Sequence, residues 1–128
     1  MSDEFEAALV GVLVDCGCEV DSVIGETSKE LAVDYKGLKF YISRTTGLKK
    51  GELVVVADPS IVKTLDLKVG PLKGVSIRTG RSGRYISSSN YKRYRNKGEL
   101  DRTNEHFGAA YTLDVSSDLT AVSSFFKV

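Results

Sequence analysis

The sequence has 128 residues, of which 41% are hydrophobic, and its formal net charge is +1. This composition is typical of one globular domain and excludes a disordered chain. The longest apolar run, residues 7–14, is interrupted by Gly11 and is far shorter than the roughly 20 residues that span a bilayer. The chain begins MSDEFE, which is acidic where a signal peptide is basic. We therefore expect a cytoplasmic protein that does not associate with membranes.

The first half of the chain predicts one helix followed by four strands. Apolar residues recur at helical spacing from Phe5 to Leu13, and Ser2 or Asp3 can cap their helix, so we expect a helix over residues 2–16. Short β-type runs separated by turns follow. They predict strands at residues 19–24, 30–35, 38–43 and 52–57. The last of these is almost wholly apolar, which is typical of a central strand covered on both faces.

The second half predicts two helices and two strands. Asp58 can cap a short helix in which Pro59 takes the first position and Leu65 is apolar. Strands are expected at residues 75–79 and 107–115, a loop at 80–90 and a closing helix at 116–126. The hairpin-length turns favour a mostly antiparallel sheet. The predicted fold class is therefore α+β. We expect a single domain over residues 1–128, with five to six strands flanked by an N-terminal, a short middle and a C-terminal helix.

The small net charge conceals a strong separation of charge along the chain. Residues 67–98 carry nine Lys or Arg and no acid, whereas residues 1–34 carry nine Asp or Glu against Lys29 alone. Such asymmetry concerns partners and not the fold. The acidic region is either a solubilising surface or a face for a basic partner, such as the cleft of a nuclease. If the two regions pack together, they neutralise each other; if they lie apart, the basic region stays free.

The basic region is the best candidate for a functional surface. Arginines and glycines alternate in R-T-G-R-S-G-R, and tyrosines are interleaved with basic residues in Y-K-R-Y-R. This composition suits a docking surface for an acidic protein, where Arg and Tyr are frequent hot spots. It also suits a single-stranded RNA surface of phosphate-binding and stacking side chains, or a solvated loop. The residues predicted to contact a partner are Arg78, Arg81, Arg84, Tyr91, Arg93, Tyr94 and Arg95.

Catalytic and metal chemistry has weaker support in the sequence. R-T-G-R-S-G-R lacks the spacing and the lysine of a phosphate-binding loop, and its glycines are better explained by a bent or bulged strand end. His106 beside Glu105 is a minor hypothesis for a nuclease. A magnesium cluster of Glu99, Asp101 and Glu105 competes with the simpler hypothesis that these acids pair with the basic region.

The two cysteines indicate no cofactor. Cys16 and Cys18 are two residues apart, and zinc normally requires four ligands. We expect two reduced thiols at a helix end, as in a cytosolic compartment. The sequence therefore predicts no cofactor, no metal and no catalytic residue.

Two stretches together carry a family resemblance. The first is the opening helix with GCEVDSVIG and the hairpin LAVDYKGLKFYISRTTG; the second is SSSNYKRYRNKGELDRTNEHFGAAYTLD before a Leu- and Phe-rich helix. This layout resembles small cytosolic immunity proteins that neutralise interbacterial toxins, such as those of contact-dependent inhibition. The matching positions are Ser89, Asn90, Tyr91, Arg93, Phe107 and Gly108.

The resemblance implies a single-domain protein without catalytic function. It would bind a cognate toxin, often a nuclease, and block the active site or the substrate surface of that toxin. We therefore expect a non-enzymatic binding protein, with an immunity protein as the first hypothesis. The alternative is a small RNA- or single-stranded-nucleic-acid-binding protein that uses the basic and tyrosine-containing segment 78–97.

Overall fold

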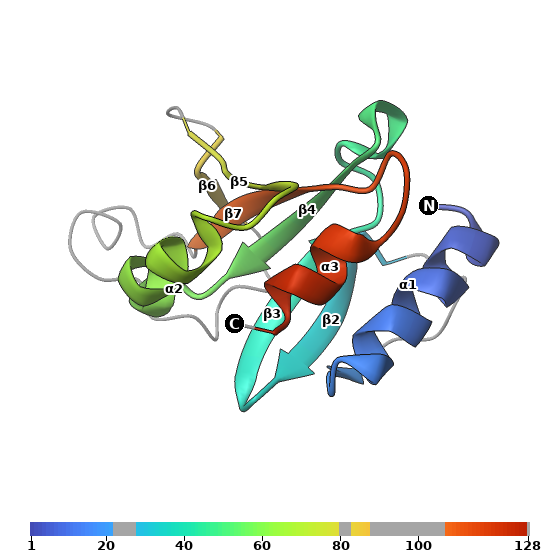
Figure 1. The fold of residues 1–128 in the computed structure, drawn as a ribbon, viewed down its shortest axis with the longest axis horizontal. Coiled ribbons are helices and arrows are strands. Elements are labelled where there is room, and N and C mark those ends of the chain that lie inside the picture. Colours follow the sequence, from blue (N-terminus) through green and yellow to red (C-terminus); the bar gives the residue numbers. More distant parts are fainter. Residues whose placement is uncertain (22–27, 80–82, 88–106, 128) are drawn as a thin grey trace.

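A computed structural model of the chain describes residues 1–21, 28–79, 83–87 and 107–127. In this part of the chain, an antiparallel seven-stranded sheet carries three α-helices on one face (Figure 1). The elements, in chain order, are α1 (Asp3–Asp15), β1 (Glu19–Val20), β2 (Glu30–Tyr35), β3 (Leu38–Ser43), the 3-10 turn η1 (Leu48–Lys50), β4 (Glu52–Ala57), the 3-10 turn η2 (Pro59–Ile61), α2 (Val62–Val69), β5 (Val75–Ile77), β6 (Tyr85–Ser87), β7 (Phe107–Asp114) and α3 (Thr120–Phe125).

The predicted α+β class and the positions of the three helices are confirmed. The sheet has one strand more than the predicted maximum of six, because β6 lies where the sequence predicted a loop. The closing helix begins only at Thr120 instead of residue 116, since the side chain of Asp114 holds the backbone N–H of Ser116 in a turn. The first strand ends at Val20 instead of residue 24, and residues 22–24 lie outside the described part of the chain.

Aromatic side chains at the C-terminus close the core on the helix-bearing face. Phe125 and Phe126, at the end of α3, are almost fully buried and meet Phe40 of β3 edge-to-face, with ring centroids 5.9 Å and 5.4 Å away. Such edge-to-face contacts add to the free energy of burying the rings. Leu9 and Leu13 extend the same core beneath α1.

Strand β4 is buried on both faces, as its apolar sequence predicted. Its residues alternate between the main core under the helices and a second, smaller cluster on the opposite face of the sheet. In the second cluster, Val54 and Val56 pack with Tyr41 of β3 and Ala110 of β7.

The order of the strands separates the acidic and basic parts of the described chain. The sheet runs β1-β2-β3-β4-β7-β5, and β6 also pairs with β7. The acidic N-terminal elements α1, β1 and β2 therefore lie at one edge, whereas β5 and β6, from the basic region, lie at the other (Figure 1). The described portions of the two regions do not neutralise each other by packing together.

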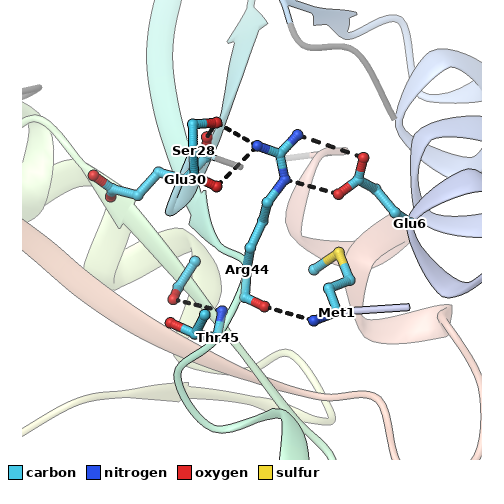
Figure 2. A network of polar contacts seen from close by, with 7 residues as sticks. Met1, Glu6, Ser28, Glu30, Arg44 and Thr45 are labelled. Carbon is cyan, nitrogen blue, oxygen red and sulfur yellow. Dashed lines mark hydrogen bonds and ion pairs between the residues drawn. The ribbon is translucent and has the colours of Figure 1, made fainter. Parts of the chain in front are cut away.

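A buried ion pair ties α1 to the end of β3. Figure 2 shows the Arg44 guanidinium between Glu6 and Ser28. Its Nε donates to Glu6 Oε1 at 2.7 Å and one Nη donates to Ser28 O at 3.0 Å, while the N-terminal amine of Met1 donates to Arg44 O at 2.9 Å. Both charged residues are at most 5% exposed. A buried pair of this kind is costly to break, because the remaining charge loses its partner without regaining water.

We predict that Glu6→Gln lowers the free energy of unfolding by about 3 kcal/mol, because the arginine cannot give up its proton and would stay buried without a compensating carboxylate. The matched control is Asp34→Asn, which removes the charge of a carboxylate that pairs with Lys39 at a partly exposed site. That variant should lose less than about 1 kcal/mol. Urea unfolding of both variants measures the difference, and equal losses would show that the Glu6 pair is not special.

Candidate functional site

Strands β5 and β6 are two parts of one interrupted edge strand. Both pair antiparallel with the same side of β7, β5 opposite residues 111–113 and β6 opposite residues 107–109. The other side of β7 pairs with β4 over residues 109–114. Ala110 is the single residue of β7 between the residues that pair with β5 and those that pair with β6.

The backbone of Ala110 holds both ends of the interruption. Arg78 N–H donates to Ala110 O at 3.3 Å, and Ala110 N–H donates to Arg84 O at 2.8 Å. In a regular antiparallel pair, one opposite residue makes both of these bonds. Here Arg78 makes one of these bonds and Arg84 makes the other, so the edge strand is interrupted between them. We call residues 78–84 the arginine loop; its sequence is R-T-G-R-S-G-R.

Gly83 allows the backbone near the two ends of the arginine loop, at residues 79 and 83, to come close together. A Cβ atom at Gly83 would lie only 2.3 Å from the backbone oxygen of Thr79. At that separation the backbone must shift to admit a side chain, so glycine allows the chain to pass this close to Thr79. The sequence predicted that the glycines of this segment permit a bent or bulged strand end, and Gly83 lies at a close approach of two backbone segments. Residues 80–82, which include Arg81, lie outside the described part of the chain.

Arg84 anchors the base of the arginine loop to helix α2 and to β7. One Nη donates to both carboxylate oxygens of Asp66, at 2.8 Å and 2.9 Å, and the other donates to Ala110 O at 3.3 Å. The guanidinium carbon lies 4.9 Å from the centre of the Tyr111 ring, within range of a cation–π interaction. Tyr111 completes the cluster, because its hydroxyl donates to Asp66 Oδ1 at 2.6 Å.

Burial and hydrogen bonding set the charge states of this cluster. Burial disfavours the charge on Arg84, but hydrogen bonds with Asp66 and Tyr111 outweigh this, and the pKa of Arg84 is raised. Burial raises the pKa of Tyr111 well above its usual value, and the hydrogen bond to Asp66 adds to this. The cluster therefore holds a charged arginine and a neutral phenol over the ordinary pH range.

The structure describes two of the seven residues predicted to contact a partner. Arg78 is half-buried at the first position of the arginine loop, and it forms no ion pair within the described ranges. Arg84 turns to the interior of the molecule, so its geometry is that of an anchor; the sequence did not predict this role. The others, Arg81, Tyr91, Arg93, Tyr94 and Arg95, lie outside the described residues, as do Glu99, Asp101, Glu105 and His106.

Sequence reasoning missed Asp66 and Tyr111. Tyr111 stands in a largely apolar strand, and a buried tyrosine usually needs a partner for its hydroxyl, which was a usable signal. Asp66 is the last acid before the acid-free stretch 67–98. Nothing in the local pattern indicates that it faces an arginine 18 residues later.

The cysteines are both free. Cys16 caps the C-terminus of α1, and Cys18 lies buried in the core. Burial raises the pKa of the Cys18 thiol to about 11, with a contribution from the neighbouring Cys16, so Cys18 is a poor nucleophile. In the described ranges, no three potential metal ligands among His, Cys, Asp and Glu gather at one place. No helix in those ranges has the length and apolar character that crossing a membrane requires.

Comparisons of the chain with protein-family models, with curated proteins and with solved structures gave no significant match. Among the described residues, those at the two ends of the arginine loop bear most directly on a function for this chain.

We predict that Gly83→Ala destabilises the protein by more than about 1 kcal/mol, because the added Cβ collides with the backbone of Thr79. The matched control is Gly11→Ala in α1, where a Cβ meets nothing within 4 Å. There the same change should stabilise by up to about 1 kcal/mol through helix propensity. Thermal and urea unfolding measure the stability of both variants. If Gly83→Ala leaves stability unchanged, the close approach of Gly83 to the backbone of Thr79 is contradicted.

The raised pKa of Tyr111 predicts a loss of stability in alkali. Above about pH 10 the unfolded tyrosine ionises while the folded one stays neutral, so the unfolded state releases a proton that the folded state keeps, and stability falls as pH rises. Tyr111→Phe has no such proton, and its stability should fall less steeply between about pH 9 and 11. Urea unfolding across this range compares the two slopes. Identical slopes would mean that Tyr111 titrates normally in the folded protein.

Proposed function

We propose that the chain is a non-enzymatic binding protein that holds an acidic surface of a protein partner with the arginine loop and the basic residues beside it. The observation that carries this proposal is the interruption of the edge strand at Ala110, where Arg78 and Arg84 bond the same residue of β7. Irregularities in edge strands are frequent next to functional sites, where they redirect side chains.

The anchoring of the loop supports a role in binding. A loop held at its base loses less conformational entropy on association than a free one, and this preorganisation improves affinity. The base of the arginine loop is held by two backbone bonds to Ala110 and by the pair of hydrogen bonds from Arg84 to Asp66. The guanidinium also bonds Ala110 O, and lysine cannot reproduce this planar, forked arrangement.

The separation of charge across the sheet also supports this proposal. The acidic elements α1, β1 and β2 lie at the edge opposite β5 and β6. Lys73 and Arg78, both from the basic region, form no ion pair within the described ranges. An exposed basic edge attracts an acidic surface, accelerates association and makes it sensitive to salt.

The resemblance of the sequence to immunity proteins makes a toxin the first partner to test. In this proposal the protein acts in the cytoplasm and neutralises a cognate toxin, most simply a nuclease. It would do so by covering the active site or the substrate surface of the toxin.

We expect a tagged full-length chain, expressed in its native host, to retain a stoichiometric protein partner that survives nuclease treatment. The double variant Arg78→Glu, Arg81→Glu should lower retention at least about tenfold, because it places acids opposite an acidic surface. Quantitative mass spectrometry of the eluted material measures the retention. If the partner is a toxin, co-expression of the chain should also protect cells from it.

The matched control reverses two charges elsewhere. Lys49→Glu, Lys50→Glu changes the net charge equally on η1, which lies outside the basic region 67–98, and should leave retention unchanged. If RNA is recovered, and no protein stays bound after nuclease treatment, the protein partner is rejected in favour of the nucleic-acid alternative. Equal retention by both double variants would reject the arginine loop as the contact.

A further inference from the structure

A cavity of about 370 Å³ opens on the helix-bearing side of the sheet. It lies between the β2–β3 hairpin of the sheet, the η2–α2 segment and the end of α3. Figure 1 shows α2 and α3 on the same face of the sheet. Its volume falls in the range of small-molecule sites. None of its lining residues belongs to the arginine loop, so it is separate from the proposed partner surface.

The floor of the cavity is aromatic and well packed. Phe40, Phe125, Phe126 and Tyr35 line it. The Phe126 ring meets those of Tyr35 and Phe125 edge-to-face, with centroids 5.6 Å and 4.9 Å away. Because each of these residues is at most 7% exposed and held by its neighbours, the floor is formed before any ligand enters. Leu38, which also lines the cavity, is 39% exposed and offers apolar surface to the body of a ligand above this floor.

One wall of the cavity is also apolar. Ile61 at the end of η2 and Leu65 on α2 face it, and Ser60 and Thr64 on the same segment contribute hydroxyl-bearing side chains. The cavity therefore combines an apolar interior with a few polar groups, the usual composition of a small-ligand site.

Two lysines give the cavity its charge. Lys36, at the hairpin turn, and Lys68, on α2, both line it and are both exposed. No Asp or Glu is among its lining residues, and neither lysine forms an ion pair within the described ranges. Lys36 Nζ lies 5.1 Å from the centre of the ring of Tyr35, which also lines the cavity.

We propose that this cavity binds a small amphipathic carboxylate, such as a medium-chain fatty acid. The apolar body lies on the aromatic floor, and the carboxylate lies at the opening, where Lys36 and Lys68 supply positive charge from two separate elements. Burial of the apolar body provides most of the affinity, and the two lysines select an anionic head group over a neutral or cationic one.

Titration of the full-length chain with octanoate, octanol and octylammonium tests this, because the three share a chain and differ in the head group. Chemical shifts of the methyl groups of Ile61 and Leu65 report binding in the cavity. Octanoate should bind about tenfold more tightly than octylammonium, with octanol between them. Absence of binding by octanoate, or equal affinity for the three, would overturn the proposal.

Variants of the lysines give the second arm of the test. Lys36→Ala and Lys68→Ala should each weaken octanoate binding about threefold, the size of a partly exposed charge interaction. Lys63→Ala is the matched control, because Lys63 lies on the same helix but does not line the cavity; its affinity should equal that of the unchanged protein. If all three lysine variants weaken octanoate binding equally, Lys36 and Lys68 do not select the anionic head group.

A variant that fills the cavity separates binding there from binding elsewhere. Thr64 is exposed on α2, so Thr64→Phe should leave the fold intact, which circular dichroism can verify. The larger ring should abolish octanoate binding. Undiminished binding by the folded variant would place the ligand elsewhere and overturn the proposal.

Discussion

The main-chain pairing of β7 is the constraint on which the rest of the structure depends. This strand bonds β4 along one side and both β5 and β6 along the other. Backbone groups inside a sheet must find partners, and at Ala110 both are supplied, one by Arg78 and one by Arg84. The pairing of β7 is therefore complete on this side although β5 and β6 are separate strands.

Two arginines stabilise the described structure in different ways. Arg44 is buried with Glu6 and joins α1 to the sheet, so its pair matters mainly for stability. Arg84 is more exposed, and its pair with Asp66 joins the base of the arginine loop to α2. Both use two hydrogen bonds to a carboxylate, a geometry that fixes orientation as well as charge. A single side-chain type thus serves the core in one place and a candidate binding loop in another.

The proposed partner surface and the cavity share helix α2 but no lining residue. Asp66 of α2 pairs with the arginine loop, whereas Leu65 and Lys68 line the cavity. A ligand in the cavity would therefore contact the same short helix that anchors the loop. The aromatic floor of the cavity belongs to the main core, so the site depends on the same packing that holds α3 against the sheet.

The sequence by itself determined the features that are local. Capping residues such as Ser2 and Asp58 marked helix starts, alternation marked β2 and β7, and a continuous apolar run marked β4, because each pattern follows from the geometry of a few neighbouring residues. The charge separation along the chain was also visible. Only the tertiary structure decided that β6 pairs with β7, that Arg84 meets Asp66 and Tyr111, and that the described parts of the two charged regions lie at opposite edges. These outcomes depend on contacts between residues far apart in the chain, and no local pattern encodes which distant partner completes a hydrogen bond.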